Sequence, residues 1–386
     1  MAFIHYLIKC FFHFLLHVFW VFPVKGNRIA FLNELSFKYG DNLKYLNEYI
    51  KTNYPGKYEL VYPLINKEEA IDNDLHYIKP FSLIYFKYLL TSSVIITNAG
   101  GTSYLPVRKN QLIVNTWHGG GPYKKTGNTV YEGKWYYKEL EMQRKNVKYV
   151  VSSCKMCTDY EFKGMLYEKE ACLPFGMPRN DIFFDSTLPL RKKVFDTFNL
   201  KDSIKIVLFA PTFRSDATDF TDSKKYHVSD IDYEKLLFAL RNKFDGEWKL
   251  AIRLHPKLKN VKIDVPNAQN FTEYPDMQEL LYASDVVITD YSSLMWDFSF
   301  TGRPCFIYAD DIDEYERDRG FYMPSSQWPF PIAKTSDEMI KNIESFDLGE
   351  YQRKLKKHHK ESGSYECGEA CESVINFVKK YLDGDE

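Results

Sequence analysis

The sequence predicts an α/β protein of two Rossmann-like domains with a cleft between them. Short apolar strands alternate with helical stretches in both halves of the chain, which is the pattern of parallel sheets. Its 386 residues exceed what one ordinary core holds, so two domains of roughly 150–200 residues are expected. Unusual polar residues follow the predicted strands in both halves, where ligands bind in open α/β sheets.

The bulk composition is that of a globular protein with large aromatic cores or surfaces. Hydrophobic residues make up 45% and aromatic residues 17% of the chain. The formal net charge of −1 gives no overall attraction to nucleic acid, so an anion site has to be local. The seven cysteines are irregularly spaced and odd in number, which favours reduced, buried thiols. A zinc site built from Cys154, Cys157, Cys367 and Cys371 is the alternative.

Residues 1–24 form an apolar, Phe-rich stretch that ends near Pro23. His5, Lys9, His13 and His17 recur every four residues, which on a helix gives one narrow polar stripe. Lys9 inside the stretch and the lack of a small-residue cleavage site argue against a signal peptide or a clean transmembrane span. We therefore expect a helix lying in a membrane interface, with docking on the protein's own core or a single span as alternatives.

In the first half, the predicted order is strand, helix, strand, helix and then three strands. The strands are expected over residues 28–32, 59–62, 94–98, 112–116 and 148–151, and the helices over 41–52 and 82–90. Asp41 is the expected cap of the first of these helices. Gly176 and Pro178 then punctuate residues 175–181, which we interpret as the boundary between the domains.

The second half repeats the alternation. Strands are expected over residues 204–210, 249–254, 286–289 and 305–308, and helices over 233–244, 294–300 and 366–382. The predicted domains are accordingly 25–180 and 181–365, with 366–386 as a C-terminal helix or tail.

His118 follows a predicted strand and precedes three glycines. Gly119 and Gly120 let a substrate approach the backbone closely, and Trp117 flanks the site. A histidine in such a place can exchange a proton near neutral pH, although a structural role is the alternative for a single histidine.

The second half places cations at its strand ends. Arg253 and His255 lie on one side of a strand that Pro256 stops, and Arg214 follows another strand. A guanidinium and an imidazole together suit a phosphate, whereas a surface or carboxylate-paired charge is the alternative for each arginine.

Residues 285–304 supply a strand, a polar turn and a helix. Ser292 or Ser293 is the expected N-cap, and backbone N–H groups and hydroxyls at such a turn suit an anion such as phosphate. The alternative is that these serines only cap the helix. The chain has no P-loop, no G-x-G-x-x-G after a strand, no H-E-x-x-H and no G-x-S-x-G. We expect no metal and no cofactor.

Together these segments resemble the CDP-glycerol glycerophosphotransferases, the primases and polymerases of teichoic acids. The similarity runs over roughly residues 28 to 370, and its segments are 39–45, 115–119 with 124–127, 175–181, 210–214, 253–256, 285–297, 303–304 with Tyr315, and 319–322. Gly120-Gly121-Pro122 departs from the Thr-Pro-Leu that often follows the family's His-Gly. This departure affects the expected acceptor site.

The resemblance implies a GT-B-like fold and transfer of glycerol phosphate from CDP-glycerol to a hydroxyl of a lipid-linked glycan or polymer acceptor, with release of CMP. It implies a peripheral enzyme on the cytoplasmic side of the cell membrane, with no nucleic-acid partner. His118 and His255 are the expected catalytic pair, facing each other across the cleft, with His118 as the base and the reverse assignment open. The expected donor-binding residues are Thr212, Arg214, Arg253, Asp290, Ser292 and Ser293, and the acceptor-side residues are Trp117, Gly119, Gly120 and Lys124.

Three alternatives remain at this point. The donor is CDP-ribitol or another CDP-polyol, the protein is a GT-B glycosyltransferase that uses a nucleotide sugar, or it is an inactive polymer-binding scaffold. The retained pair His118 and His255, together with the serine turn, argues against the scaffold.

Overall fold

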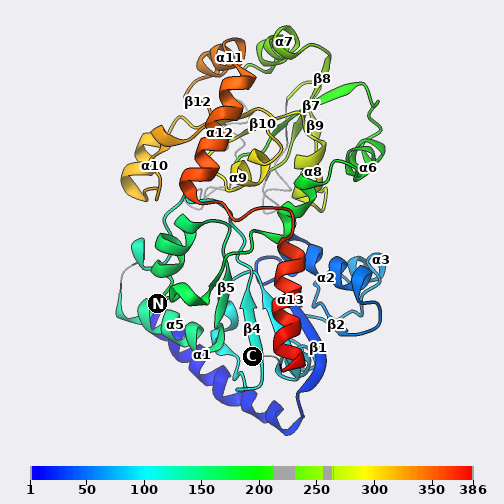
Figure 1. Cartoon of the computed structure of the whole chain (residues 1–386), viewed down its shortest axis with the longest axis vertical. Coiled ribbons are helices and arrows are strands. Elements are labelled where there is room, and N and C mark those ends of the chain that lie inside the picture. The colour runs from blue at the N-terminus through cyan, green and yellow to red at the C-terminus, as the bar shows by residue number, and fades with distance from the viewer. Residues whose placement is uncertain (1, 132, 213–230, 255–262, 264, 385–386) are drawn as a thin grey trace. The chain divides into compact units, whose positions relative to one another are not determined.

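The computed structural model describes residues 2–131, 133–212, 231–254, 263 and 265–384. The chain divides into two compact units (Figure 1). The first comprises Met1–Gly121, Lys125–Asp181 and Gly363–Glu386, and the second comprises Pro122–Lys124 and Ile182–Ser362. The chain therefore ends in the unit in which it begins.

The first unit is built on a six-stranded parallel sheet. Its strands lie in the order β2-β1-β3-β4-β5-β6, with parallel pairing throughout. They are β1 (Lys25–Leu32), β2 (Glu59–Val61), β3 (Ser92–Thr97), β4 (Leu112–Asn115), β5 (Tyr149–Val151) and β6 (Cys172–Leu173). The central strands β3 and β4 are buried along their whole length, as expected for a parallel sheet covered on both faces.

Helices cover this sheet. They are α1 (Ala2–Leu16), α2 (Asp41–Asn53), α3 (Lys67–Asp72), α4 (Leu83–Leu90), α5 (Lys134–Asn146) and the C-terminal α13 (Ala370–Asp383). α13 packs beside α2. Short 3-10 helices η1 (His17–Val21), η2 (Gly101–Tyr104), η3 (Gly127–Thr129), η5 (Lys169–Ala171) and η6 (Pro178–Phe184), and the π-helix η4 (Cys157–Phe162), fill the connections.

The second unit repeats the architecture with strand order β12-β11-β10-β7-β8-β9, again entirely parallel. The strands are β7 (Ile204–Phe209), β8 (Glu247–Ile252), β9 (Gln269–Asn270), β10 (Val286–Thr289), β11 (Cys305–Tyr308) and β12 (Ile332–Ala333). The helices are α6 (Leu190–Thr197), α7 (Tyr233–Phe244), α8 (Met277–Ala283), α9 (Leu294–Ser299), α10 (Ile312–Asp318), α11 (Ser336–Glu344) and α12 (Leu348–Ser362), with a 3-10 turn η9 (Ser325–Gln327). The predicted fold class of two parallel α/β halves is confirmed.

The segment Pro122–Lys124 is held by the second unit although it follows the last strand-end glycines of the first. Lys124 forms an antiparallel bridge with Phe321, and the backbone oxygen of Tyr123 accepts from Tyr322 N at 2.7 Å. The Tyr123 hydroxyl lies 2.9 Å from Nε2 of His358. Burial lowers the pKa of His358 to about 3, so this ring is neutral and serves packing.

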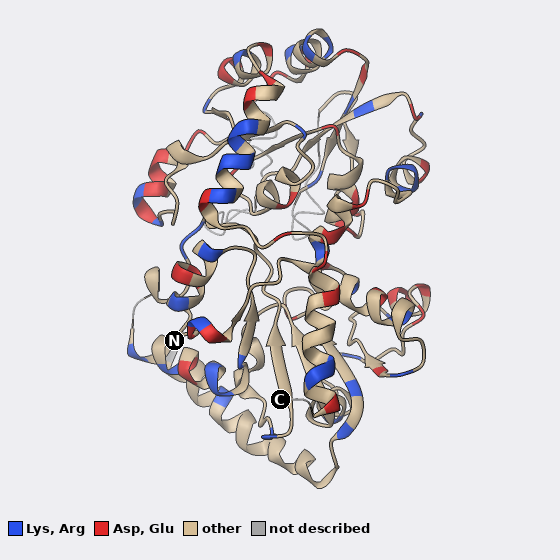
Figure 2. Ribbon diagram, viewed as in Figure 1, with Lys and Arg blue, Asp and Glu red and all other residues tan. Residues whose placement is uncertain are grey.

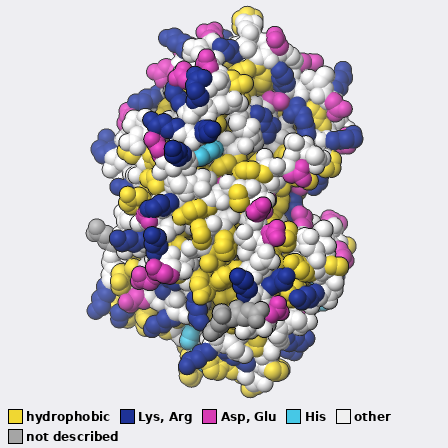
Figure 3. Space-filling view, in the orientation of Figure 1, with side chains coloured by type: hydrophobic (Ala, Val, Ile, Leu, Met, Phe, Trp, Pro, Cys, Tyr) yellow, Lys and Arg dark blue, Asp and Glu magenta, His cyan; other side chains and the backbone are white. Residues whose placement is uncertain are grey.

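The N-terminal helix has an unusual distribution of side chains. Lys9 pairs with Glu139 of α5, and His13 is half-buried, so part of the predicted polar stripe faces the protein itself. Phe11, Phe14 and other apolar side chains of α1 are exposed instead. The α1 ribbon is almost free of charged residues in Figure 2, and hydrophobic side chains reach the lower edge of Figure 3. By length and composition alone, residues 3–21 could span a membrane.

Candidate active site

The imidazole of His118 is oriented by a backbone carbonyl. Its Nδ1 lies 2.8 Å from the backbone oxygen of Asn98, which follows β3. A carbonyl oxygen only accepts hydrogen bonds, so Nδ1 carries the proton and Nε2 keeps its lone pair. Burial lowers the pKa of His118, which keeps the ring neutral near neutral pH. The arrangement therefore presents Nε2 as a proton acceptor.

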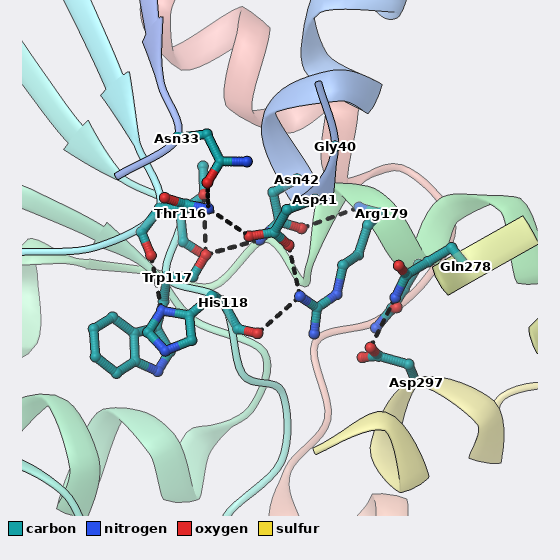
Figure 4. A network of polar contacts seen from close by, with 12 residues as sticks. Asn33, Gly40, Asp41, Asn42, Thr116, Trp117, His118, Arg179, Gln278 and Asp297 are labelled. Carbon is teal, nitrogen blue, oxygen red and sulfur yellow. Dashed lines mark hydrogen bonds and ion pairs between the residues drawn. The ribbon is translucent and has the colours of Figure 1, made fainter. Parts of the chain in front are cut away.

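The turn that carries His118 is held by side chains from other segments (Figure 4). Nδ2 of Asn42 donates to the backbone oxygens of Thr116 at 3.3 Å and Trp117 at 3.0 Å. Nη1 of Arg179 donates to the backbone oxygen of His118 at 2.8 Å. Trp117 has φ 55°, a left-handed conformation that is costly for a bulky residue. These bonds hold the turn in that conformation.

Asp41 connects the two sides of this network. Its Oδ1 accepts from Nη1 of Arg179 at 2.6 Å, and its Oδ2 accepts from Nδ2 of Asn98 at 2.8 Å. Asn98 also donates to Asn33 Oδ1 at 3.0 Å. The expectation that Asp41 caps α2 is wrong: Gly40 stands at the N-cap without a side-chain bond. The carboxylate of Asp41 instead binds the arginine that holds the His118 turn.

The indole of Trp117 is hydrogen-bonded to a buried carboxyl group. Its Nε1 donates to Oε1 of Glu161 at 3.2 Å, and Thr126 Oγ1 donates to the same oxygen at 3.3 Å. Burial raises the pKa of Glu161 to about 7 despite these donors. The Trp117 ring lies 4.2 Å from the His118 ring, centroid to centroid. Glu161 thus fixes the indole that flanks the histidine.

The glycines after His118 form a turn in which the chain leaves the first sheet. Gly119 is half-buried and Gly120 is buried. Gly121 has φ 77°, where a side chain would be strained, and its N–H donates to Ser153 Oγ at 3.2 Å. Lys124, expected on the acceptor side, belongs to the second unit, and its Nζ lies 5.1 Å from the ring centroid of Tyr291.

In the second unit, the polar residues after β7 and β10 meet. Oδ2 of Asp290 accepts from the backbone N of Thr212 at 3.0 Å and from its Oγ1 at 2.6 Å. Asp290 is buried. The predicted donor-side residues Thr212 and Asp290 are therefore direct partners at adjacent strand ends.

The serine turn begins α9 in the predicted way, but its hydroxyl groups are little used by the helix. Ser293 is the N-cap residue and makes no side-chain cap bond. Ser292 Oγ accepts from Leu294 N at 3.4 Å, which is long for a strong hydrogen bond. Both side chains are partly exposed. The turn thus retains hydroxyl donors for a ligand.

Arg253 follows β8, and its Nη2 donates to the backbone oxygen of Tyr274 at 3.2 Å. Among the described residues, its Nη1 has no hydrogen-bond partner. Burial lowers the pKa of Arg253 to about 10, which leaves it a cation at neutral pH. The predicted residues Arg214 and His255 lie outside the described residues. In the described part of the chain, His, Cys, Asp and Glu side chains form no cluster of three or more that could hold a metal ion.

Two parallel α/β units with polar side chains at their strand ends make this a protein of GT-B-like architecture. The chain belongs to the CDP-glycerol:poly(glycerophosphate) glycerophosphotransferase family, whose model matches residues 14–380.

Individual relatives agree with this assignment. The chain is 27% identical over 376 residues to a teichoic acid poly(glycerol phosphate) polymerase of Staphylococcus epidermidis, covering 92% of this chain and 51% of the relative. It is 26% identical over 360 residues to a teichoic acid poly(ribitol-phosphate) polymerase of Bacillus spizizenii, covering 88% and 54%. The chain thus spans about half the length of these two relatives.

The fold is also that of a solved relative. A variant of the wall teichoic acid polymerase TagF, soaked with CDPG, superposes with a TM-score of 0.82 at 26% identity. The match covers 94% of this chain and 90% of that structure. The GT-B-like fold predicted through the family resemblance is confirmed.

The sequence reasoning did not assign Asn42, Asn98 or Arg179 to the site. Asn42 and Arg179 lie inside segments 39–45 and 175–181, both of which carried the family resemblance. Asn98 ends the predicted strand over residues 94–98. The available signal was that polar residues close to strand ends gather at one edge of a parallel sheet.

Proposed function

We propose that the protein transfers glycerol phosphate from CDP-glycerol to a hydroxyl group of an acceptor and releases CMP. The observation that carries this proposal is the protonated Nδ1 of His118, bound to the Asn98 carbonyl at 2.8 Å, which leaves Nε2 as a base. An acceptor hydroxyl is a poor nucleophile at neutral pH. A neutral, oriented imidazole makes it a better one by taking its proton as it attacks. Family membership supplies the reaction class.

The proposed step balances as a substitution at phosphorus. The acceptor oxygen attacks the phosphorus that bears glycerol while Nε2 of His118 takes the hydroxyl proton. The bond between that phosphorus and the oxygen bridging to the cytidylyl phosphate breaks, and CMP leaves with the bonding electrons. Negative charge grows on the phosphoryl oxygens and on CMP, so cations and N–H or O–H donors must stand there.

The second unit has the groups that this donor requires. We assign the diphosphate to the turn of Ser292 and Ser293 and to the cation of Arg253, with Thr212 and Asp290 shaping the adjacent strand ends. Arg214 and His255 are proposed to add charge there. In this scheme His255 stabilises the donor phosphates, and an exchange of roles between the two histidines is the alternative.

We also propose that α1 holds the enzyme peripherally on the cytoplasmic side of the cell membrane, near a lipid-linked acceptor. Phe14 is 74% and Phe11 59% exposed, whereas Lys9 contacts Glu139. Exposed apolar side chains, with Lys9 and His13 half-buried toward the protein, suit a lipid interface. Deleting residues 2–16 should abolish co-sedimentation with anionic vesicles and preserve CMP release with a soluble acceptor; an unfolded product would assign the helix to the core instead.

The experiment that tests the activity is mass-spectrometric detection of CMP from CDP-glycerol, CDP-ribitol and UDP-sugars. CMP from CDP-glycerol that depends on His118 supports the proposal. The ribitol-phosphate relative makes CDP-ribitol the second candidate. UMP or UDP release instead would make the protein a glycosyltransferase, and no release from any donor would favour a polymer-binding scaffold.

A further inference from the structure

A cavity lies in the first unit, at the beginning of α5. Its volume is about 450 Å³. Its lining residues are Asn128, Tyr131, Gly133, Lys134, Tyr136, Tyr137, Lys138 and Glu141. None of these residues takes part in the network around His118, so the proposed chemistry leaves this cavity without a role.

The tyrosines give the cavity flat, amphipathic walls. The rings of Tyr131 and Tyr136 lie 5.4 Å apart at an interplanar angle of 52°. Tyr131 is 52% and Tyr137 47% exposed, which is high for side chains of this size. Aromatic walls of this kind pack against the C–H faces of a sugar ring, and phenolic hydroxyls bind its hydroxyl groups. Asn128 adds an amide donor and acceptor.

Two lysines and one carboxylate, Glu141, line the same cavity, so its charged lining carries two cations against one anion. Lys134 and Lys138 are one helical turn apart on α5, so both line one side. Their Nζ atoms lie 5.8 Å and 5.0 Å from the ring centroid of Trp135. Lysine ammonium groups beside neutral aromatic walls suit an anion such as a phosphate or diphosphate.

The helix that carries the two lysines also packs against α1. Trp135 packs against Phe3 and Tyr6 of α1, with centroid distances of 4.5 Å and 5.6 Å. Lys138, which lines the cavity, also lies over Tyr6. Figure 1 shows α1 and α5 side by side. The element next to the lysine side of the cavity is therefore α1.

We propose that this cavity binds the sugar-phosphate head of the lipid-borne acceptor. The assignment rests on the proposed transferase function and adds to it an acceptor subsite separate from the base. Tyr131 and Tyr137 would contact the sugar, Lys134 and Lys138 its phosphate, and the exposed side chains of α1 would continue into the lipid.

The test is direct binding without donor. The probe is N-acetylglucosamine joined through a diphosphate to an octyl chain, titrated by calorimetry into the full chain. Tyr137→Ala and Lys134→Ala should each weaken binding by about 10-fold, as expected if these two side chains are the main contacts of the ligand. Tyr160→Ala is the matched control, because Tyr160 is 53% exposed in the same unit but does not line the cavity.

Because this titration contains no nucleotide, it stands even if CDP-glycerol proves to be the wrong donor. In turnover, both variants should raise the acceptor KM by a similar factor at nearly unchanged kcat and donor affinity. Unchanged probe affinity in Tyr137→Ala and Lys134→Ala would overturn the proposal. A glycerol phosphate oligomer that binds as tightly as the sugar probe would overturn the sugar assignment, and octyl phosphate binding as tightly would make the cavity a lipid site only.

Discussion

The strand ends of the two units differ in how they are prepared for ligands. In the first unit, the turn that bears His118 is fixed by Asn42 and Arg179, and the ring is fixed by the Asn98 carbonyl. In the second unit, Ser293 makes no cap bond, and Nη1 of Arg253 has no partner among the described residues. The first site is bonded up to its histidine ring, whereas the second, beyond its Thr212–Asp290 pair, keeps donors without partners among the described residues.

This difference matches the roles proposed for the two sites. A base must present one lone pair in one direction before its substrate arrives, because misplacement by an ångström is costly in rate. A diphosphate brings several strong acceptors of its own, so donors that wait unpaired become paired only in the complex. A buried unpaired donor costs about 1–3 kcal/mol in the free protein. Under the proposed function, the unpaired Nη1 of Arg253 costs stability in the free protein and is paired when the donor binds.

The largest expected effect comes from His118→Ala. If the first site is a preorganised base, kcat should fall roughly 10²–10⁴-fold, the typical worth of general-base catalysis. Donor affinity by calorimetry should hardly change, since the base does not hold the nucleotide. Rates would be followed as CMP release between about pH 6 and pH 9.

His76→Ala is the matched control for this experiment, since His76 is an exposed histidine of the same unit. If His118→Ala folds like the wild type and retains its kcat across that pH range, His118 is not the base. The bonded site of the first unit would then have a structural role only.

The second prediction concerns how buried Glu161 in the first site makes the free energy of unfolding depend on pH. Burial raises the pKa of Glu161 from its ordinary value of 4.5 to about 7. Below pH 4.5 both folded and unfolded chains hold this proton, so the group contributes nothing. Between these values the unfolded chain releases the proton and the folded chain keeps it, so the free energy of unfolding falls as pH rises, by roughly 3 kcal/mol in total.

Glu161→Gln mimics the protonated carboxyl and still accepts from Trp117. Urea unfolding at about pH 5 and pH 8 should therefore show a smaller loss of stability in the variant than in the wild type, by roughly 3 kcal/mol. Exposed Glu168 provides the control substitution Glu168→Gln. Equal losses in wild type and Glu161→Gln would mean that Glu161 is ionised in the folded protein.

The third prediction tests the second unit. Ser293→Ala removes a hydroxyl that the helix does not use, so the fold should be unaffected while donor binding weakens by roughly 1–3 kcal/mol. Ser345→Ala is the control, because its hydroxyl donates to the Lys341 carbonyl within a surface helix end. Full CDP-glycerol affinity in Ser293→Ala would leave this serine as a helix-start residue without a role in the site.

The sequence allowed the parallel strands and the strand-end residues to be predicted, because both depend on local patterns. Burial makes β3 and β10 short apolar runs, and His118 and Asp290 follow strands directly. The strands β6, β9 and β12 have two residues each, too few for any periodicity. These strands were not predicted.

The internal bonds of the first site could not be predicted because their partners are distant in sequence. Arg179 and His118 are 61 residues apart, and Asn42 and Trp117 are 75 apart. Asp41 was misassigned because an acidic residue before a helix has the same local appearance whether it caps the helix or binds an arginine. Only the folded sheet brings Arg179 to Asp41.

The smallest expected effect separates position from charge within the first site. Arg179 Nη1 serves both Asp41 Oδ1 and the His118 backbone oxygen. Arg179→Lys keeps the cation but loses the planar guanidinium that holds both acceptors, so kcat should fall only about 10-fold, with donor affinity intact.

The charge of Arg179 contributes to the lowered pKa of His118, so the acid limb of the pH–rate profile should stay in place in Arg179→Lys. In Arg179→Met it should move to higher pH, because the lost cation allows His118 to take up its proton more readily and leaves Asp41 without that partner. Arg241→Met, an exposed arginine on α7, controls for loss of charge alone. If both Arg179 variants lose the same rate with no difference in the acid limb, Arg179 acts through the shape of the turn and not through the pKa of His118.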